Sequence, residues 1–436
     1  MRILIHGINY APELTGIGKY TGEMAEWLAA QGHDVRVVTA PPYYPQWKIA
    51  DGYSNWWGSE EQGIRGKGQD KFEFSDLQRA PVVVYRCPLW VPARPSGVKR
   101  LIHLASFALS SLPVMLRQAF WKPDVVWVAE PALMCAPATA LVARLCGAKA
   151  WLHVQDFEVD AAFDMGILPF GKLRDVVLWV ERWLMRRFDR VSTISVNMSS
   201  RLVMKGVDAE YAVLFPNWVD TNHVLPLVGR NPLRSELGIA PERLVALYSG
   251  NMGEKQGLEI VLEVAQRMQE RATDDGPDGV PSDVLFVMCG DGAARQQLME
   301  SYVGLRNVMW LPLKPMEKLN ELLNMADIHL LPQRADVADL VMPSKLTGML
   351  ASGRAVIATA FPDTQVAQVV GQCGLVSSPG DVDGLLRAIN KLASDTSLRV
   401  TLGCRAREYA LAHLSKEAVL ADFERELCAV TSLQLG

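Results

Sequence analysis

Residues 244–265 read LVALYSGNMGEKQGLEIVLEVA, and this stretch decides the interpretation of the fold. Its first five residues are apolar, as expected of a strand buried on both faces of a parallel sheet. From Leu258 the apolar residues recur with the period of a helix. The glycine-containing turn between them lets the backbone approach a ligand closely, and Lys255 places a positive charge beside the helix N-terminus. These features predict a phosphate site in the first βα unit of a nucleotide-binding domain.

Composition restricts the class of protein. The 436 residues suggest two domains, and 49% apolar with 21% charged residues is typical of a folded globular chain. A net charge of −4 and the lack of zinc-finger spacing argue against nucleic-acid binding. Seven scattered cysteines without a CxxC pair favour free thiols in a reducing cytosol. The sequence shows neither a signal-peptide pattern nor an apolar run of roughly 20 residues, so we expect a cytoplasmic protein.

Short apolar runs alternate with helical patterns along the chain, which predicts doubly wound parallel sheets of the α/β class. The first half contains expected strands at 2–8, 33–40, 82–88, 124–130, 148–156, 190–195 and 211–217. The second half contains expected strands at 244–248, 284–290, 308–313, 328–332, 355–359 and 374–378. Ligands of such sheets bind beyond the carboxyl ends of the strands.

The pattern restarts midway, which predicts a Rossmann-like domain at 1–220 and another at 221–396. Residues 397–436 are expected to form a helical tail that could return to the first domain. Within the first domain, residues 41–79 are rich in Pro, Gly, Tyr and Trp. We interpret them as an irregular excursion from the sheet, with a mobile part near 63–69.

Five motifs occur in order: GINYAPELTGIGKY, LHVQDFEVD, YSGNMGEKQGLE, CGDG and VMPSKLTGMLASGRAVIAT. Together they resemble the GT-B glycosyltransferases of family 4, and more closely the branch that builds colanic-acid-type exopolysaccharides. The resemblance implies two Rossmann-like domains facing across a cleft. The C-terminal one would mainly hold a nucleotide-sugar donor, and the N-terminal one the acceptor. It also implies a transfer that retains the sugar's configuration and needs neither a cofactor nor a metal.

The resemblance assigns donor binding to three segments of the C-terminal domain. Family members supply an Arg and a Lys from the first segment; here Asn251 occupies the Arg position and Lys255 matches the Lys. A preorganised cation would stabilise the charge that develops on the leaving diphosphate, so Lys255 is assigned a catalytic role. A solvated surface lysine is the structural alternative. The expected donor-binding residues are Ser249, Gly250, Asn251, Gly290, Asp291, Gly292, Pro343, Ser344, Lys345, Leu346 and Thr347.

The third segment departs from the wider family. Its helix-start signals and the charge of Lys345 fit a helix beneath the donor diphosphate, where the family places it. Family members also carry two glutamates separated by seven residues. The later one, which usually holds the ribose, falls near Thr347 or Gly348, and Asp336 or Asp339 could replace the earlier one. No carboxylate is therefore assigned to the ribose.

In the N-terminal half, the resemblance directs two segments toward the cleft. His153, at the end of a strand, would point at the donor sugar's hydroxyls or phosphate, and Asp156 follows it. Both are assigned catalytic roles, with a satisfied core histidine as the structural alternative. The loop before the first helix is assigned to the acceptor, although an ordinary helix-entry loop fits equally well. Its residues are Glu13, Gly16, Gly18 and Lys19.

Two helical stretches of the first half combine apolar, aromatic and basic residues, as an interfacial helix does. Residues 98–122 carry an apolar face flanked by Lys99 and Arg100, and we expect them to contact an anionic membrane surface. Residues 176–188 are similar, but packing against the sheet is the preferred interpretation there. Residues 1–220 contain 24 basic and 22 acidic side chains, against 20 and 26 in the remainder. We therefore expect peripheral attachment to the inner face of the cell membrane.

These expectations define a metal-independent hexosyl- or fucosyl-type transferase that acts on a polyprenyl-diphosphate-linked saccharide. The resemblance makes GDP-L-fucose the leading donor, followed by UDP-sugars. Two alternatives stay open. A GT-B-like sugar-nucleotide 2-epimerase shares the architecture, and the missing Glu and Arg would suit a degenerate, non-catalytic member of an assembly complex.

Overall fold

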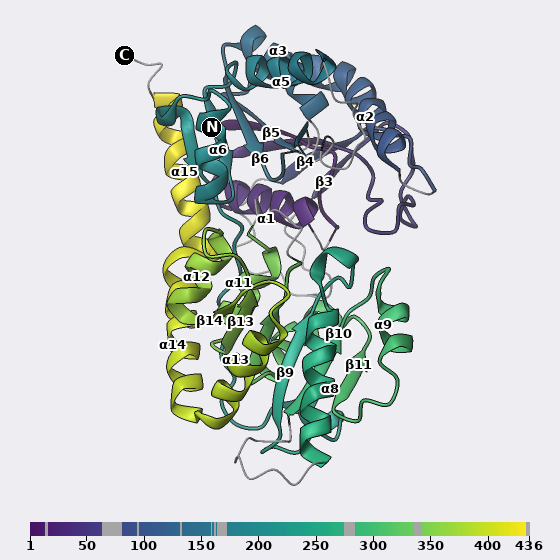
Figure 1. The fold of residues 1–436 in the computed structure, drawn as a ribbon. Coiled ribbons are helices and arrows are strands. Elements are labelled where there is room, and N and C mark those ends of the chain that lie inside the picture. The colour runs from purple at the N-terminus through teal and green to yellow at the C-terminus, as the bar shows by residue number, and fades with distance from the viewer. Residues whose placement is uncertain are drawn as a thin grey trace, which may run out of the picture. The chain divides into compact units, whose positions relative to one another are not determined.

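A computed structural model describes residues 1–13, 16–62, 81–93, 96–130, 133–157, 159–160, 163, 172–273, 284–334 and 342–432. The chain divides into two compact units, labelled by their elements in Figure 1. Unit 1 comprises Met1–Pro216 and Leu420–Gly436, and unit 2 comprises Asn217–Val419. The tail expected at 397–436 is thus divided between the two units.

In the described part of unit 1, eight strands form one sheet in the order β3-β4-β2-β1-β5-β6-β7-β8. Neighbouring strands are parallel except β3 and β4, which are antiparallel. The inner strands are almost wholly buried, as a sheet covered by helices on both faces requires. The strands are β1 (Arg2–His6), β2 (Asp34–Thr39), β3 (Gly58–Gln62), β4 (Val82–Arg86), β5 (Val125–Glu130), β6 (Lys149–Val154), β7 (Arg190–Thr193) and β8 (Ala212–Leu214).

The connections determine which face each helix of unit 1 covers. The crossovers β4→β5, β5→β6 and β6→β7 all step in the same direction along the sheet, whereas β1→β2 steps in the opposite direction. Because such crossovers are right-handed, α2, α3 and α5 lie on one face and α1 on the other. The helices are α1 (Gly16–Ala30), α2 (Gly97–Gln118), α3 (Ala136–Cys146), α5 (Lys172–Met185) and α6 (Val196–Met204), with 3-10 turns η2 (Ala119–Trp121), η3 (Leu133–Cys135) and η4 (Ala209–Tyr211).

The last helix, α15 (Lys416–Ser432), begins in unit 2, and its residues from Leu420 onward belong to unit 1. Phe423 stacks on Phe215 with ring centroids 4.2 Å apart and meets Trp151 edge-on at 5.1 Å. The Glu424 carboxylate lies 2.9 Å from Nε2 of His33. These contacts with residues near β2, β6 and β8 hold the end of the chain on unit 1.

In the described part of unit 2, six strands form an all-parallel sheet in the order β11-β10-β9-β12-β13-β14. The strands are β9 (Leu244–Ser249), β10 (Val284–Cys289), β11 (Val308–Leu311), β12 (Ile328–Leu331), β13 (Ala355–Thr359) and β14 (Gly374–Ser377). The helices are α7 (Pro232–Glu236), α8 (Glu259–Thr273), α9 (Arg295–Ser301), α10 (Leu319–Asn324), α11 (Ser344–Ala351), α12 (Gln365–Cys373), α13 (Val382–Ser394) and α14 (Thr396–His413), with 3-10 turns η5 (Glu254–Gln256) and η6 (Met316–Lys318).

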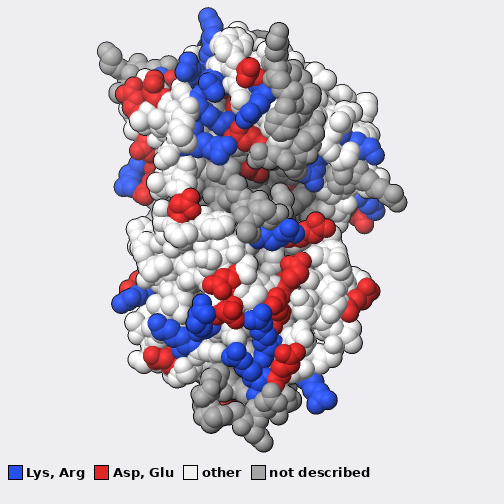
Figure 2. Space-filling model, in the orientation of Figure 1, with Lys and Arg blue, Asp and Glu red and all other residues white. Residues whose placement is uncertain are grey.

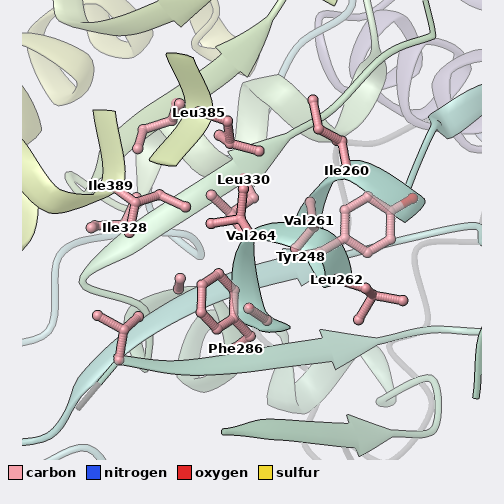
Figure 3. Packing of buried hydrophobic residues seen from close by; sticks show 14 of the residues in the cluster. Tyr248, Ile260, Val261, Leu262, Val264, Phe286, Ile328, Leu330, Leu385 and Ile389 are labelled. Atoms are coloured by element: carbon pink, nitrogen blue, oxygen red, sulfur yellow. The ribbon is translucent and has the colours of Figure 1, made fainter. Parts of the chain in front are cut away.

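The core of unit 2 is built around β9 and α8, the strand and helix predicted from residues 244–265. Figure 3 shows Tyr248 and Val261 from these elements packed with Phe286 of β10, Leu330 of β12 and Leu385 of α13. All five are at most 2% exposed. Burying large apolar side chains from five elements in one cluster is what holds the parallel strands together.

The α/β class with two parallel sheets is confirmed, and each strand expected from the sequence has a counterpart near its predicted bounds. One expectation was incomplete. The excursion at 41–79 contains β3, which pairs antiparallel at the sheet edge and is too polar, GSEEQ, to carry an apolar alternation. The expected mobile part at 63–69 lies outside the described residues. No helix in the described ranges combines the length and apolarity needed to cross a bilayer.

Candidate functional site

The carboxyl ends of β9 and β10 carry two loops that are joined by backbone hydrogen bonds. The N–H of Gly250 donates to the carbonyl of Cys289 over 3.0 Å, and that of Met252 donates to Asp291 over 2.8 Å. In return, the N–H of Ala294 donates to the carbonyl of Met252 over 2.9 Å. These bonds bring two of the predicted donor segments, YSGN and CGDG, together at one edge of the unit 2 sheet.

Two glycines make this close approach of the loops possible. Gly290 and Gly292 have φ values of +145° and +152°. A Cβ on Gly290 would collide with the carbonyl oxygen of Gly250, and one on Gly292 would lie 2.5 Å from that of Met252. Glycine accepts both the dihedral angle and the contact. Asp291, between them, is exposed and accepts the N–H of Gly292 over 2.8 Å.

Lys345, the second residue of α11, brings the third predicted segment to the same edge. Its Nζ lies 4.4 Å from the ring centroid of Tyr248 and donates to the hydroxyl over 3.3 Å. The Tyr248 hydroxyl in turn donates to the carbonyl of Asn251. The lysine is partly exposed, but the packed atoms around its ammonium lower the pKa of Lys345 to about 8, because desolvation disfavours the charged form.

This lysine has the properties of an anion-binding group. Within the described ranges no carboxylate forms an ion pair with it, and desolvation is the cause of its lowered pKa. A phenol ring and a neutral hydroxyl compensate an ammonium less than a carboxylate does. A ligand with a negative charge would therefore stabilise the charged form.

The remaining predicted residues, at the start of α11, differ in whether their side chains are exposed or buried. Pro343 is the N-cap residue, and Ser344 begins the helix with its side chain exposed. Leu346 is fully buried in the apolar cluster of α11, α12 and α14, so its side chain belongs to the core. Thr347 is 5% exposed and its hydroxyl donates to the carbonyl of Ser344 over 2.8 Å. Gly348 sits against α10, because a Cβ there would lie 3.3 Å from Leu323.

Lys255 lies in η5, one turn beyond the loop that follows β9. The turn is fixed by Gly253, whose N–H donates to Oε1 of Gln256 over 3.0 Å. The structure describes the backbone of Lys255 but not its side chain, so its catalytic role stays a prediction. Asn251, in the expected Arg position, is exposed. Asp336 and Asp339 lie outside the described residues.

His153 is an interior residue of unit 1. It is 2% exposed, its Nδ1 lies 2.8 Å from Oγ of Ser192, and Nε2 of Gln155 lies 2.8 Å from its Nε2. The ring also stacks on Trp127 at 5.5 Å. Burial lowers the pKa of His153 to about 3, so the imidazole is neutral at pH 7. Asp156, two residues beyond β6, is exposed. The expected catalytic roles of both residues stay predictions.

Glu13 connects two loops of unit 1. Its Oε2 accepts from Nδ2 of Asn9 over 2.9 Å, and its Oε1 accepts the N–H groups of Tyr43 and Tyr44, each over 3.1 Å. The carboxyl is buried, which raises the pKa of Glu13, while these hydrogen bonds and the charge of Arg86 oppose the increase. Both carboxyl oxygens therefore hold the loops after β1 and β2 in place.

The other predicted acceptor residues surround Glu13. Gly16 has a φ of +61°, and a Cβ on Gly18 would lie 2.7 Å from the Glu13 side chain, so both glycines shape the entry to α1. Lys19 is partly exposed, with Nζ 3.9 Å from Glu23 of the next helical turn. The structure thus brings the four residues together beyond β1. Contact with an acceptor stays a prediction.

Sequence reasoning missed two residues that organise these edges. The sequence pattern makes Tyr248 the last apolar residue of a strand, and only its hydroxyl indicates a polar contact. Arg86 ends β4, donates to the carbonyls of Ala40 and Ala11 and pairs with Glu60 over 2.7 Å. An arginine at the end of a buried strand is the signal that the sequence offers, since a buried guanidinium needs hydrogen-bond partners.

Among the described residues, no three His, Cys, Asp or Glu side chains are arranged to hold a metal ion.

Comparison with known proteins identifies the class. The Glycosyl transferase 4-like domain matches residues 15–218, and the Glycosyl transferases group 1 family matches residues 229–409. Sucrose-phosphate synthase from Thermosynechococcus elongatus aligns with a TM-score of 0.71 at 16% identity, over 99% of this chain and 100% of that one. Anabaena HepE in complex with UDP-glucose aligns with a TM-score of 0.64 at 16% identity, over 98% and 100% of the two chains. The fold is therefore GT-B.

A relative with much higher sequence identity than these solved structures identifies the family within the GT-B class. The glycosyl transferase WcaI of Escherichia coli (strain K12), whose name places it in colanic acid biosynthesis, is 42% identical over 436 residues. The match covers 98% of this chain and 100% of WcaI. The chain belongs to this family of glycosyltransferases, which confirms the resemblance found in its motifs.

Proposed function

We propose that this glycosyltransferase moves a sugar, with retention of configuration, from a nucleotide-sugar donor to a lipid-linked saccharide in the biosynthesis of a colanic-acid-like exopolysaccharide. The observation that carries the donor half is Lys345, a desolvated cation at the glycine-lined edge of the unit 2 sheet. The full-length similarity to WcaI supports the pathway.

The chemistry follows from the charges. Cleavage of the bond between the sugar and the diphosphate leaves negative charge on the β-phosphate. Lys345, at the start of α11, would stabilise this charge where it develops. Lys255 is proposed to add a second cation from η5. The departing phosphate would accept the proton of the acceptor hydroxyl on the same face of the sugar. Catalysis would then depend on positioning and electrostatics, without a covalent intermediate or a metal.

The donor's nucleotide can be identified by thermal stabilisation. GDP-L-fucose is the proposed donor, with UDP-sugars as the second candidate. A ligand that binds only the folded state raises the melting temperature by mass action. GDP, UDP and dTDP should be compared at equal concentration, and the preferred nucleotide should lose its effect in Lys345→Met. Equal stabilisation of the wild type and Lys345→Met would contradict the proposed phosphate site. Measured turnover of the donor would distinguish a transferase from a non-catalytic relative.

The exposed surface of α2 supports a lipid-linked acceptor. The helix turns His103, Phe107, Ser111, Met115 and Gln118 into unit 1. The apolar face expected from the sequence is therefore not the buried face. Its outward side exposes aliphatic residues beside the exposed cations of its first turn, namely Val98, Ile102, Leu109, Leu116, Lys99 and Arg100.

This combination fits an anionic membrane surface, where a polyprenyl diphosphate would be embedded. Figure 2 shows Lys and Arg side chains of unit 1 at the top of the view, interspersed with Asp and Glu side chains. We propose that unit 1 attaches peripherally to the inner face of the cell membrane through α2. Charge reversal in Lys99→Glu/Arg100→Glu should release the chain from vesicles that contain anionic lipid.

A further inference from the structure

Helix α5 has a second apolar face that does not pack against unit 1. Glu181, Leu184 and Met185 point inward and are at most 5% exposed. On the opposite side lie four residues at the spacing i, i+3, i+4 and i+7, which forms one stripe on a helix. These residues, exposed by 44% to 63%, are Val176, Trp179, Val180 and Trp183.

The orientation of α5 is fixed by a buried ion pair. Nζ of Lys205, on the segment after α6, donates to Oε2 of Glu181 over 2.6 Å and to Oδ1 of Asp160 over 3.1 Å. Arg201 also pairs with Asp160, over 2.9 Å. Rotating the helix to bury its tryptophans would separate the buried Glu181 carboxylate from Lys205 and leave that charge without its partner, at a high energetic cost. The stripe therefore stays on the surface.

The charges beside the stripe select the kind of partner. Arg182, Arg186 and Arg187 are exposed on or just after α5, whereas Asp175 is the exposed acid among the described residues of the helix. The guanidinium of Arg187 lies 4.4 Å from the ring of Trp183. Tryptophan with arginine on an aliphatic helix face matches the boundary between lipid headgroups and acyl chains.

The topology places this stripe on the same face of the sheet as α2. Right-handed crossovers put α2, α3 and α5 on that face, and α3 packs against α2. Helix α3 also exposes Leu141 and Leu145. Figure 1 shows the three helices at the same end of unit 1. A lipid surface that meets α2 can therefore also reach α5.

We propose that the outward stripe of α5 is a second lipid-contact surface, whose tryptophans enter the headgroup region of an anionic bilayer while the surrounding arginines bind its phosphates. The proposal rests on the proposed membrane attachment of unit 1. It assigns the stripe to the membrane rather than to a protein partner or a second copy of the chain.

The test uses the full chain and vesicles of phosphatidylcholine with or without phosphatidylglycerol. In sedimentation, Trp179→Ser/Trp183→Ser should bind anionic vesicles about tenfold or more weakly, because two aromatic side chains leave the interface. The control is Val303→Ser/Leu313→Ser, which removes exposed aliphatic residues of unit 2 and should bind as the wild type does. Circular dichroism verifies that both variants are folded.

A conservative variant gives a second readout that does not depend on weakened binding. Trp179→Phe/Trp183→Phe should still bind vesicles, but its remaining tryptophan emission should be quenched less by brominated acyl chains than that of the wild type. Unchanged quenching would place the two rings outside the lipid and overturn the proposal.

The outcomes also separate this inference from the proposed attachment. If Trp179→Ser/Trp183→Ser binds normally while Lys99→Glu/Arg100→Glu does not, α2 remains the lipid contact and the proposal for α5 is wrong. If the wild-type chain binds neither kind of vesicle, both fail, and a protein partner or self-association must cover the stripe.

Discussion

Glu13 of unit 1 and Lys345 of unit 2 both lie beyond the carboxyl ends of parallel strands, but their partners differ. The two oxygens of Glu13 accept three hydrogen bonds from neighbouring loops. Lys345 contacts a phenol ring and its hydroxyl, with no ion pair in the described part of the chain. A polar group with internal partners organises its unit, whereas a cation without an acid partner is suited to a ligand. His153, with both ring nitrogens engaged, belongs with Glu13.

The largest effect is expected from removing the charge of Lys345. Lys345→Met keeps the length of the side chain, and turnover of the preferred donor should fall roughly 10²- to 10³-fold, as when a preorganised donor to developing charge is removed. Without nucleotide, the variant should be as stable as the wild type or more so, because a desolvated charge is gone. Lys391→Met, an exposed lysine of α13, is the control. If Lys345→Met were less stable than the wild type without nucleotide but turned over the donor normally, Lys345 would be a structural residue like Glu13 rather than a ligand-binding one.

Lys255 is the second cation of unit 2 that we expect to act on the ligand rather than on stability. Lys255→Ala should lower turnover by about 10²-fold by the same mechanism, with the melting temperature without nucleotide close to that of the wild type. Unchanged kcat in the folded variant would assign the lysine to the solvated surface.

Truncation of a group that has internal partners should affect stability instead. His153→Ala removes the hydrogen bonds to Ser192 and Gln155, and we expect a loss of about 1–3 kcal/mol in the free energy of unfolding. Chemical denaturation of the variant gives this value. Nucleotide affinity, measured by calorimetry, should not change. A stable variant with impaired turnover would instead support the predicted catalytic role of His153.

Tyr248 offers a smaller test, because its ring and hydroxyl contact Lys345 separately. Tyr248→Phe keeps the ring under the ammonium but loses the hydroxyl that accepts from Lys345 and donates to Asn251. Nucleoside diphosphate affinity should fall about tenfold, corresponding to roughly 1.4 kcal/mol. Tyr248→Leu should lose more. If both variants bind as the wild type does, Tyr248 does not position the lysine.

The smallest effect is a dependence on pH. The pKa of Lys345 is lowered from 10.5 to about 8, so the ammonium loses its proton as the pH rises through about 8. Nucleotide affinity should therefore fall roughly twofold between pH 7 and 8, with proton uptake on binding. Between pH 8 and 10.5 the unfolded chain holds more protons at this group, so the contribution of Lys345 to stability should rise with pH. Calorimetry in buffers of different ionisation enthalpy measures the uptake, and Lys345→Met should abolish it.

Local patterns predicted the parallel strands well, because a strand buried on both faces is a continuous apolar run. They failed at β3, whose residues GSEEQ lie at an edge and have no apolar signal. Nor did they identify the inward face of α2. Its inward face contains His103, Ser111 and Gln118, whose polar groups are matched by Trp90, His6 and Arg36. Hydrophobicity alone cannot identify such a face, since its partners are distant in the sequence.

The sequence by itself determined the α/β class, the division into two similar halves, and the motifs that place glycines and lysines beyond the strands of unit 2. These features depend on residues that are near one another along the chain. The tertiary structure decided that Lys345 meets Tyr248, 97 residues away, and that His153 and Glu13 have internal partners. It also decided which side of α5 is exposed, because the pairing of Glu181 with Lys205 fixes the helix rotation. Such contacts depend on which strands and helices become neighbours in the folded units.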